Sequence, residues 1–215
     1  MASTADMETT TKPMAARPRP VSLAHVVLRT TKDSYRKMLW FYKEFLNAEV
    51  VMEEENFVFL AYDHEHHRIG ILYTPETQAK SGDRAGLEHV SFTFATLTAM
   101  ARVYQYMKEL DVEPYWAVNH GMTSSMYYRD PDGNKFEMQV ENFDSADEAN
   151  AFVAGPLFKQ NPIGTDIDPP SWAERILRDM KPCGEEGLAL EDMRDIKMRK
   201  EIGERHEIPP VALNA

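Results

Sequence analysis

An internal repeat limits the fold of this chain more than any other feature. The segments Leu-Ala-His-Val-Val-Leu (residues 23–28) and Leu-Glu-His-Val-Ser-Phe (residues 87–92) lie 64 residues apart. Each is followed by apolar residues at helical spacing and then by three strand-like segments, so the order β-α-β-β-β occurs twice. A repeat with one supersecondary unit per copy predicts two similar modules that bury their apolar faces together.

The boundaries of the predicted elements follow from apolar spacing and from turn residues. In the first module we expect a helix at residues 31–46 and strands at residues 22–30, 48–54, 57–62 and 68–74. In the second we expect a helix at residues 97–110 and strands at residues 87–95, 113–118, 123–129 and 135–141. Beyond them we expect helices at residues 145–154 and 170–180, separated by a loop at residues 161–170.

The length of 215 residues suits one α+β domain with extensions at both ends. We expect a flexible leader at residues 1–20, which are rich in Thr and Pro. The domain itself is expected at residues 21–142, with modules at about 21–80 and 85–142. Residues 143–215 are expected to form a C-terminal helical extension, in which residues 191–204 make a charged surface helix or a subunit contact.

Charge and cysteine content exclude several classes of function. The net charge of -11 argues against a nucleic-acid partner and against an anionic membrane surface. No apolar run approaches the roughly 20 residues that cross a bilayer. The single cysteine, Cys183, excludes an internal disulfide and indicates a reducing compartment, so we expect a cytoplasmic protein.

A predicted hairpin at residues 127–140 carries the first candidate for chemistry. Residues 130–134, Asp-Pro-Asp-Gly-Asn, are typical of a turn. The proline fixes one φ angle, the glycine tolerates positive φ, and the Asp and Asn side chains hydrogen-bond to their own backbone. The strand after it alternates apolar and polar residues, so Phe136, Met138 and Val140 share one face. Glu137 points to the other face.

Two histidines complete the candidate site with Glu137. His25 and His89 occupy the same position in the first strand of each repeat, and Glu137 lies in the strand that closes the second repeat. A lone histidine or glutamate in a strand is more often structural, but this coincidence favours a shared metal ion. Two imidazoles and one carboxylate are typical of Fe(II) sites that leave one side of the metal open. Mn, Co, Ni and Zn remain alternatives.

The chain resembles the vicinal oxygen chelate superfamily, especially the small single-domain type I extradiol dioxygenases and their glyoxalase-like relatives. The resemblance extends over about residues 21–170 and rests on residues 23–26, 86–90, 120–121, 127–137 and 161–169. It implies paired βαβββ modules that curve around a metal held by His25, His89 and Glu137. It also implies that Tyr127 lies beside a bound diol and that His120 acts as an acid or base. A small aromatic substrate and O2 follow from the same resemblance.

Some features depart from the family pattern. His120 lies 17 residues before Glu137, a shorter gap than we expect in the family. A second histidine of the family's dioxygen site has no clear match here. His64, His66 and His67 cluster in a turn, where we expect exposed side chains, although one of them could reach the pocket.

Two other functions stay open at this point. The same ligand set occurs in metal-dependent isomerases, lyases and epimerases. Native Ni, Co or Zn, together with an activity that does not depend on oxygen, would favour one of these enzymes. A non-catalytic small-molecule binder of the same fold is a third reading, which the complete ligand trio disfavours. One pair of modules can assemble within a chain or by exchange between chains, so a homodimer is also open.

Overall fold

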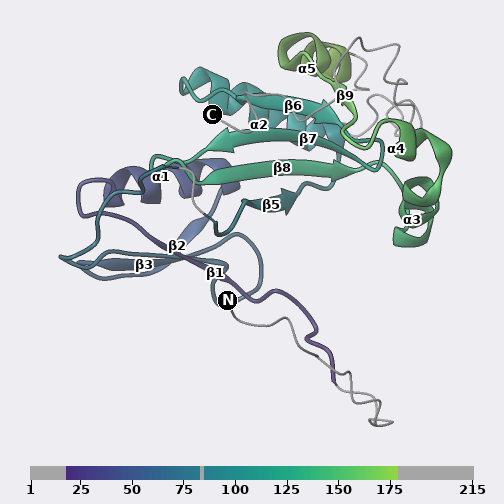
Figure 1. Ribbon diagram of the computed structural model, residues 1–215. Coiled ribbons are helices and arrows are strands. Elements are labelled where there is room, and N and C mark those ends of the chain that lie inside the picture. Colours follow the sequence, from purple (N-terminus) through teal and green to yellow (C-terminus); the bar gives the residue numbers. More distant parts are fainter. Residues whose placement is uncertain (1–17, 83–84, 179–215) are drawn as a thin grey trace.

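The computed structural model describes residues 18–82 and 85–178. It places them in two β-sheets (Figure 1). The helix of the first repeat lies between the sheets, that of the second repeat lies behind the second sheet, and the helices that follow lie at the end and the edge of the second sheet. Residues 1–17 of the expected leader, Cys183 and the helix expected at residues 191–204 lie outside the described residues. None of the described helices is long and apolar enough to span a membrane.

Each sheet is built from one repeat, as predicted. The first repeat consists of β1 (Val26–Arg29), α1 (Tyr35–Leu46), β2 (Glu49–Glu53), β3 (Phe57–Ala61) and β4 (Ile69–Leu72). The second consists of β5 (His89–Thr93), α2 (Leu97–Glu109), β6 (Trp116–Asn119), β7 (Thr123–Arg129) and β8 (Lys135–Glu141). The strand orders are β1-β4-β3-β2 and β5-β8-β7-β6-β9, where β9 (Thr165–Asp166) is added from beyond the second repeat. In both sheets the first strand of the repeat pairs in parallel with the fourth. The α+β fold of paired βαβββ modules is therefore confirmed.

The segment after β8 contains more structure than the sequence predicted. It forms α3 (Ala146–Ala154), α4 (Pro156–Gln160), β9 (Thr165–Asp166) and α5 (Pro169–Arg178). The expectation of loop throughout residues 161–170 is wrong at β9, because the open edge of β6 offers backbone hydrogen bonds to any extended segment beside it. α5 packs along α2 and buries Trp172 and Ile176.

The core joins the two modules through α1. Phe45 lies with its ring 4.3 Å from that of Phe136 on β8 and 4.6 Å from that of Tyr128 on β7. Phe41 also meets Phe136 edge-on at 5.7 Å, and all four of these side chains are buried. The helix of the first module thus fills the core of the second sheet, where aromatic rings bury large apolar areas.

The turn between β7 and β8 is tied to the same helix. The carboxylate of Asp130 accepts hydrogen bonds from the backbone N–H groups of Asp132 and Asn134, at 3.0 and 2.8 Å. It also accepts bonds from Asn134 Nδ2 at 2.8 Å and from the hydroxyl of Tyr42 on α1 at 3.1 Å. Gly133 supplies the positive φ of 77° that this turn needs. Asp130 therefore fixes the hairpin and orients it on α1.

Candidate metal and catalytic site

A row of side chains crosses the second sheet from β5 to β6. Ser91 is the register partner of Glu137, Glu137 of Tyr127, and Tyr127 of Trp116. Directly opposite residues share a face of a sheet, so these four side chains lie together. Phe136 points to the helices on the other face, as the alternation in the sequence predicted.

Glu137 is the centre of this row. The residue is 4% exposed, and its Oε2 lies 3.1 Å from Nε2 of His89. Burial acts to raise the pKa of Glu137, but hydrogen bonds from His89, Ser125, Ser91 and Tyr127 outweigh it and lower the pKa to about 2. The hydrogen bond to Glu137 in turn raises the pKa of His89. The site therefore holds a carboxylate that is negatively charged at any ordinary pH.

The geometry of His89 and Glu137 fits a pair of metal ligands. Adjacent ligands of a six-coordinate ion with bonds of about 2.1 Å lie about 3.0 Å apart. The 3.1 Å between His89 Nε2 and Glu137 Oε2 agrees with this value. Nitrogen and carboxylate oxygen are also the donors that divalent iron accepts.

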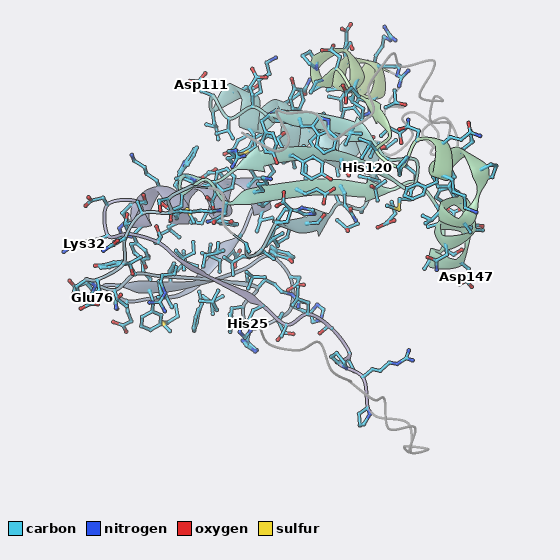
Figure 2. All side chains as sticks on the ribbon, in the orientation of Figure 1. His25, Lys32, Glu76, Asp111, His120 and Asp147 are labelled. Carbon is cyan, nitrogen blue, oxygen red and sulfur yellow. The ribbon has the colours of Figure 1, made fainter. Side chains whose placement is uncertain are left out.

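Tyr127 connects the carboxylate to His120. Its ring stacks on Trp116 at 4.8 Å with an interplanar angle of 18°, and burial is the main cause that raises its pKa. The Tyr127 hydroxyl hydrogen-bonds to Glu137 and lies 3.0 Å from Nε2 of His120. Burial lowers the pKa of His120, so its imidazole is neutral near pH 7. Figure 2 shows His120 at the end of the second sheet that faces α4 and β9.

His25 lies in the first module, just before β1, at a distance from the labelled His120 (Figure 2). Its ring is 4.4 Å from that of His67, which stacks on Phe59 at 4.3 Å. The expectation that the turn histidines are exposed is wrong for His67, which is 8% exposed because these two rings cover it. Nδ1 of His67 also lies 2.6 Å from Nδ1 of His66.

The structure therefore brings together four of the five predicted site residues. His89, Glu137, Tyr127 and His120 form one hydrogen-bonded group. Within residues 18–82 and 85–178, no three His, Cys, Asp or Glu side chains are close enough to form a metal-binding group. His25 thus stays a predicted ligand that the single chain does not bring to the other two.

The sequence analysis missed the hydroxyl groups that surround Glu137. Ser91 and Ser125 both hydrogen-bond to the Glu137 carboxylate. Ser125 stands two residues before Tyr127 and therefore on the same face of β7. The five-residue turn fixes the register of β7 against β8, so pairing the hairpin residue by residue would have identified this face.

A cavity of about 450 Å³ separates the edge strands of the two sheets. His25, Tyr62 and Arg68 line it from the first module, and Ser91 and Phe92 line it from β5. Cavities of this size hold small organic ligands, and its walls are mainly apolar. The space lies next to Ser91, the register partner of Glu137.

Comparison with known proteins identifies the family. Residues 22–138 match the family model described as the Glyoxalase/Bleomycin resistance protein/Dioxygenase superfamily. Biphenyl-2,3-diol 1,2-dioxygenase 2 of Rhodococcus globerulus is 39% identical over 157 residues, which are 73% of this chain and 80% of the relative. Biphenyl-2,3-diol 1,2-dioxygenase 3 of the same organism is 36% identical over 163 residues, which are 75% of this chain and 83% of the relative.

Among solved structures, a glyoxylase/bleomycin resistance protein/dioxygenase domain from Frankia sp. EAN1pec covers 59% of this chain and 96% of its own length. Its TM-score is 0.49 and its sequence identity is 15%, a likeness that says nothing about activity. The two dioxygenases of Rhodococcus globerulus confirm the resemblance to the extradiol branch that the sequence predicted. The chain belongs to the glyoxalase/bleomycin resistance protein/dioxygenase superfamily.

Proposed function

We propose that this protein is an extradiol-type dioxygenase that opens the ring of a catechol and inserts both atoms of O2. The two curated relatives act on biphenyl-2,3-diol by name, so the proposed substrates are catechols that carry a second aromatic or apolar group. The observation that carries the proposal is the contact between His89 and Glu137, with Tyr127 hydrogen-bonded to the same carboxylate. The proposed metal is Fe(II), with His25, His89 and Glu137 as ligands.

The residues of the chain have separate tasks in this proposal. When bound, Fe(II) supplies two positions for the diol oxygens, lowers the pKa of a bound hydroxyl and passes electron density to dioxygen. Ser91 and Ser125 hold the Glu137 carboxylate in one orientation. With substrate bound, the Tyr127 hydroxyl gives its hydrogen bond to a substrate oxygen instead of to Glu137, and the neutral imidazole of His120 accepts the proton that the diol releases.

The third ligand requires a second copy of the chain in this proposal. His25 precedes the edge strand β1 of one sheet, and His89 begins the edge strand β5 of the other. These positions are equivalent in the two repeats, and a cavity separates the two edges within one chain. We place His25 of a second copy beside His89 and Glu137, which gives a homodimer with two identical sites.

Mixing two inactive variants tests this arrangement. We expect His25→Ala and Glu137→Gln each to be inactive alone. A dimer with one chain of each kind contains one intact site if His25 comes from the second copy, so random exchange restores about a quarter of the wild-type activity. If all three ligands come from the same chain, the mixture stays inactive, and the exchange between copies is refuted.

Oxygen uptake tests the activity itself. Anaerobically purified protein should contain iron and, with Fe(II), should consume O2 and form a yellow ring-opened product from 2,3-dihydroxybiphenyl or another 3-substituted catechol. Well-metallated protein that consumes no O2 with any catechol would refute the activity. Native Ni, Co or Zn with turnover that needs no O2 would instead identify an isomerase, lyase or epimerase.

The cellular setting is a proposal of the same kind. We place the enzyme in the cytoplasm, because Fe(II) chemistry needs reducing surroundings and the chain has a single cysteine. The absence of nucleic-acid and membrane partners stays a prediction from the net charge of -11.

A further inference from the structure

The segment after the second module reaches back to the candidate site at one point. The backbone carbonyl of Ile163 lies 2.6 Å from Nδ1 of His120. A carbonyl oxygen can only accept a hydrogen bond, so Nδ1 of His120 must carry the proton and donate. In the neutral ring, Nε2 is then an acceptor that lies 3.0 Å from the Tyr127 hydroxyl. That hydroxyl has a single proton, which it can give either to Nε2 or to the Glu137 carboxylate.

A tight turn holds the Ile163 carbonyl in place. The Asn161 side chain, 1% exposed, accepts a bond from Gly164 N–H and donates one to the Gly164 carbonyl, both at 3.0 Å. Gly164 has a φ of 100°, which residues with a side chain rarely adopt. A Cβ atom there would lie 2.1 Å from the Asn119 carbonyl oxygen and 2.8 Å from Cα of His120. Only glycine allows the turn to lie this close to β6.

The same turn begins the strand that attaches the tail to the sheet. Thr165 and Asp166 of β9 pair with Asn119 and Val118 of β6. His120 follows β6 directly. The turn and the histidine are therefore held together by two contacts, the backbone pairing of β9 with β6 and the hydrogen bond from the His120 imidazole to the Ile163 carbonyl.

We propose that residues 161–164 form a positioning element for His120, which fixes the Nδ1–H tautomer and aims Nε2 at Tyr127 and the substrate oxygen. Asn161 and Gly164 are positioning residues in this scheme, since neither touches the substrate. The role of His120 as a base rests on the proposed function, whereas its tautomer does not. The segment beyond the second module thereby becomes part of the catalytic unit.

Nitrogen NMR of the imidazoles tests the tautomer without any turnover. In metal-free protein near neutral pH, we expect His120 to show a protonated Nδ1 and an unprotonated Nε2. Asn161→Ala should produce a mixture of tautomers, whereas Gly82→Ala should leave the His120 signals unchanged. Gly82→Ala is the matched control for a glycine substitution in the turn. Like Gly164, Gly82 has a positive φ, of 66°, but no atom lies within 4 Å of a Cβ added to Gly82. A protonated Nε2 in the wild-type protein would overturn the proposal.

Kinetics of paired variants test whether the turn acts through His120. We expect His120→Gln to lower kcat about 100-fold and Asn161→Ala about tenfold, with iron content and KM unchanged. In the His120→Gln background, Asn161→Ala should have no further effect on kcat. An equal tenfold loss in both backgrounds would show a purely structural role and refute the positioning. Gly164→Ala provides a second variant, for which we expect the same pattern.

The two sets of measurements separate this proposal from the activity on which it depends. If the wild-type protein cleaves no catechol but His120 has the Nδ1–H tautomer, and Asn161→Ala loses it, only the proposed reaction is refuted. An active enzyme in which Asn161→Ala leaves both the tautomer and kcat unchanged refutes only the positioning element.

Discussion

Replacing Asp130 by alanine should destabilise the protein strongly, because its carboxylate ties the turn between β7 and β8 to α1. The Tyr42 hydroxyl, on a side chain that is 2% exposed, would lose its acceptor. A buried donor without a partner costs about 1–3 kcal/mol. The three bonds from Asp132 and Asn134 are partly exposed, so water replaces part of each and we assign them about 0.5 kcal/mol apiece. Burial raises the pKa of Asp130, so removing this charge also relieves a desolvation cost. We therefore expect a net loss of about 3 kcal/mol in the free energy of unfolding.

Urea denaturation of the wild-type protein and four variants measures this loss. Asp132→Ala is the matched control, since Asp132 lies in the same turn and its side chain is not used by the Asp130 network; it should change stability by less than about 0.5 kcal/mol. Tyr42→Phe should cost about 1 kcal/mol in the wild-type chain, whereas in the Asp130→Ala chain it should raise stability by about 1 kcal/mol or more, because it removes the buried hydroxyl that has lost its acceptor. The reasoning fails if Asp130→Ala costs no more than Asp132→Ala, or if Tyr42→Phe costs the same in both backgrounds.

Three further predictions follow from the core and the site. Phe136→Ala leaves a cavity beneath Phe41 and Phe45 and should lower stability by about 3–5 kcal/mol in the same urea assay; a loss below 1 kcal/mol would contradict the packing described. In metal-free protein, the raised pKa of His89 contributes stability that is complete below its unfolded value of 6.5 and is lost as pH rises through the folded value. The pKa of Glu137, lowered from 4.5 to about 2, contributes stability that is complete above 4.5 and is lost as pH falls toward 2. Calorimetry should thus find Tm highest between pH 4.5 and 6.5, and the pH dependence of Tm should be flatter in Glu137→Gln. An unchanged pH dependence of Tm in that variant would exclude the His89–Glu137 pair as its cause. Tyr127→Phe should lower kcat while iron content stays at the wild-type level, and a loss of iron would instead make the tyrosine part of metal binding.

The sequence was most informative where the chain repeats itself. His25 and His89 marked the first strand of each module, and the turn after Asp130 marked the last hairpin, because repeats and turns are local patterns. The partners of Glu137 were harder to find, since Ser91 belongs to a strand that joins β8 in parallel from 46 residues away. Such pairings depend on the whole sheet, which no local pattern encodes.

Two misses have a similar cause. β9 has only two residues, which is too short for any periodicity, and it exists because the edge of β6 is free. His67 is buried because the rings of Phe59 and His25 pack against it, although its own neighbourhood in the sequence is polar. The position of His25 relative to Glu137 could not be predicted either, since it depends on how two modules, or two chains, are placed beside each other.

The position of α1 has a consequence for synthesis on the ribosome. Phe41 and Phe45 are made early, but their partners Tyr128 and Phe136 leave the ribosome more than 80 residues later. Until then the nascent first half carries an uncovered aromatic surface, which is the kind of surface that chaperones bind. Although the chain contains two copies of one motif, the copies share a core, and the aromatic face of α1 is covered only when both have been synthesised.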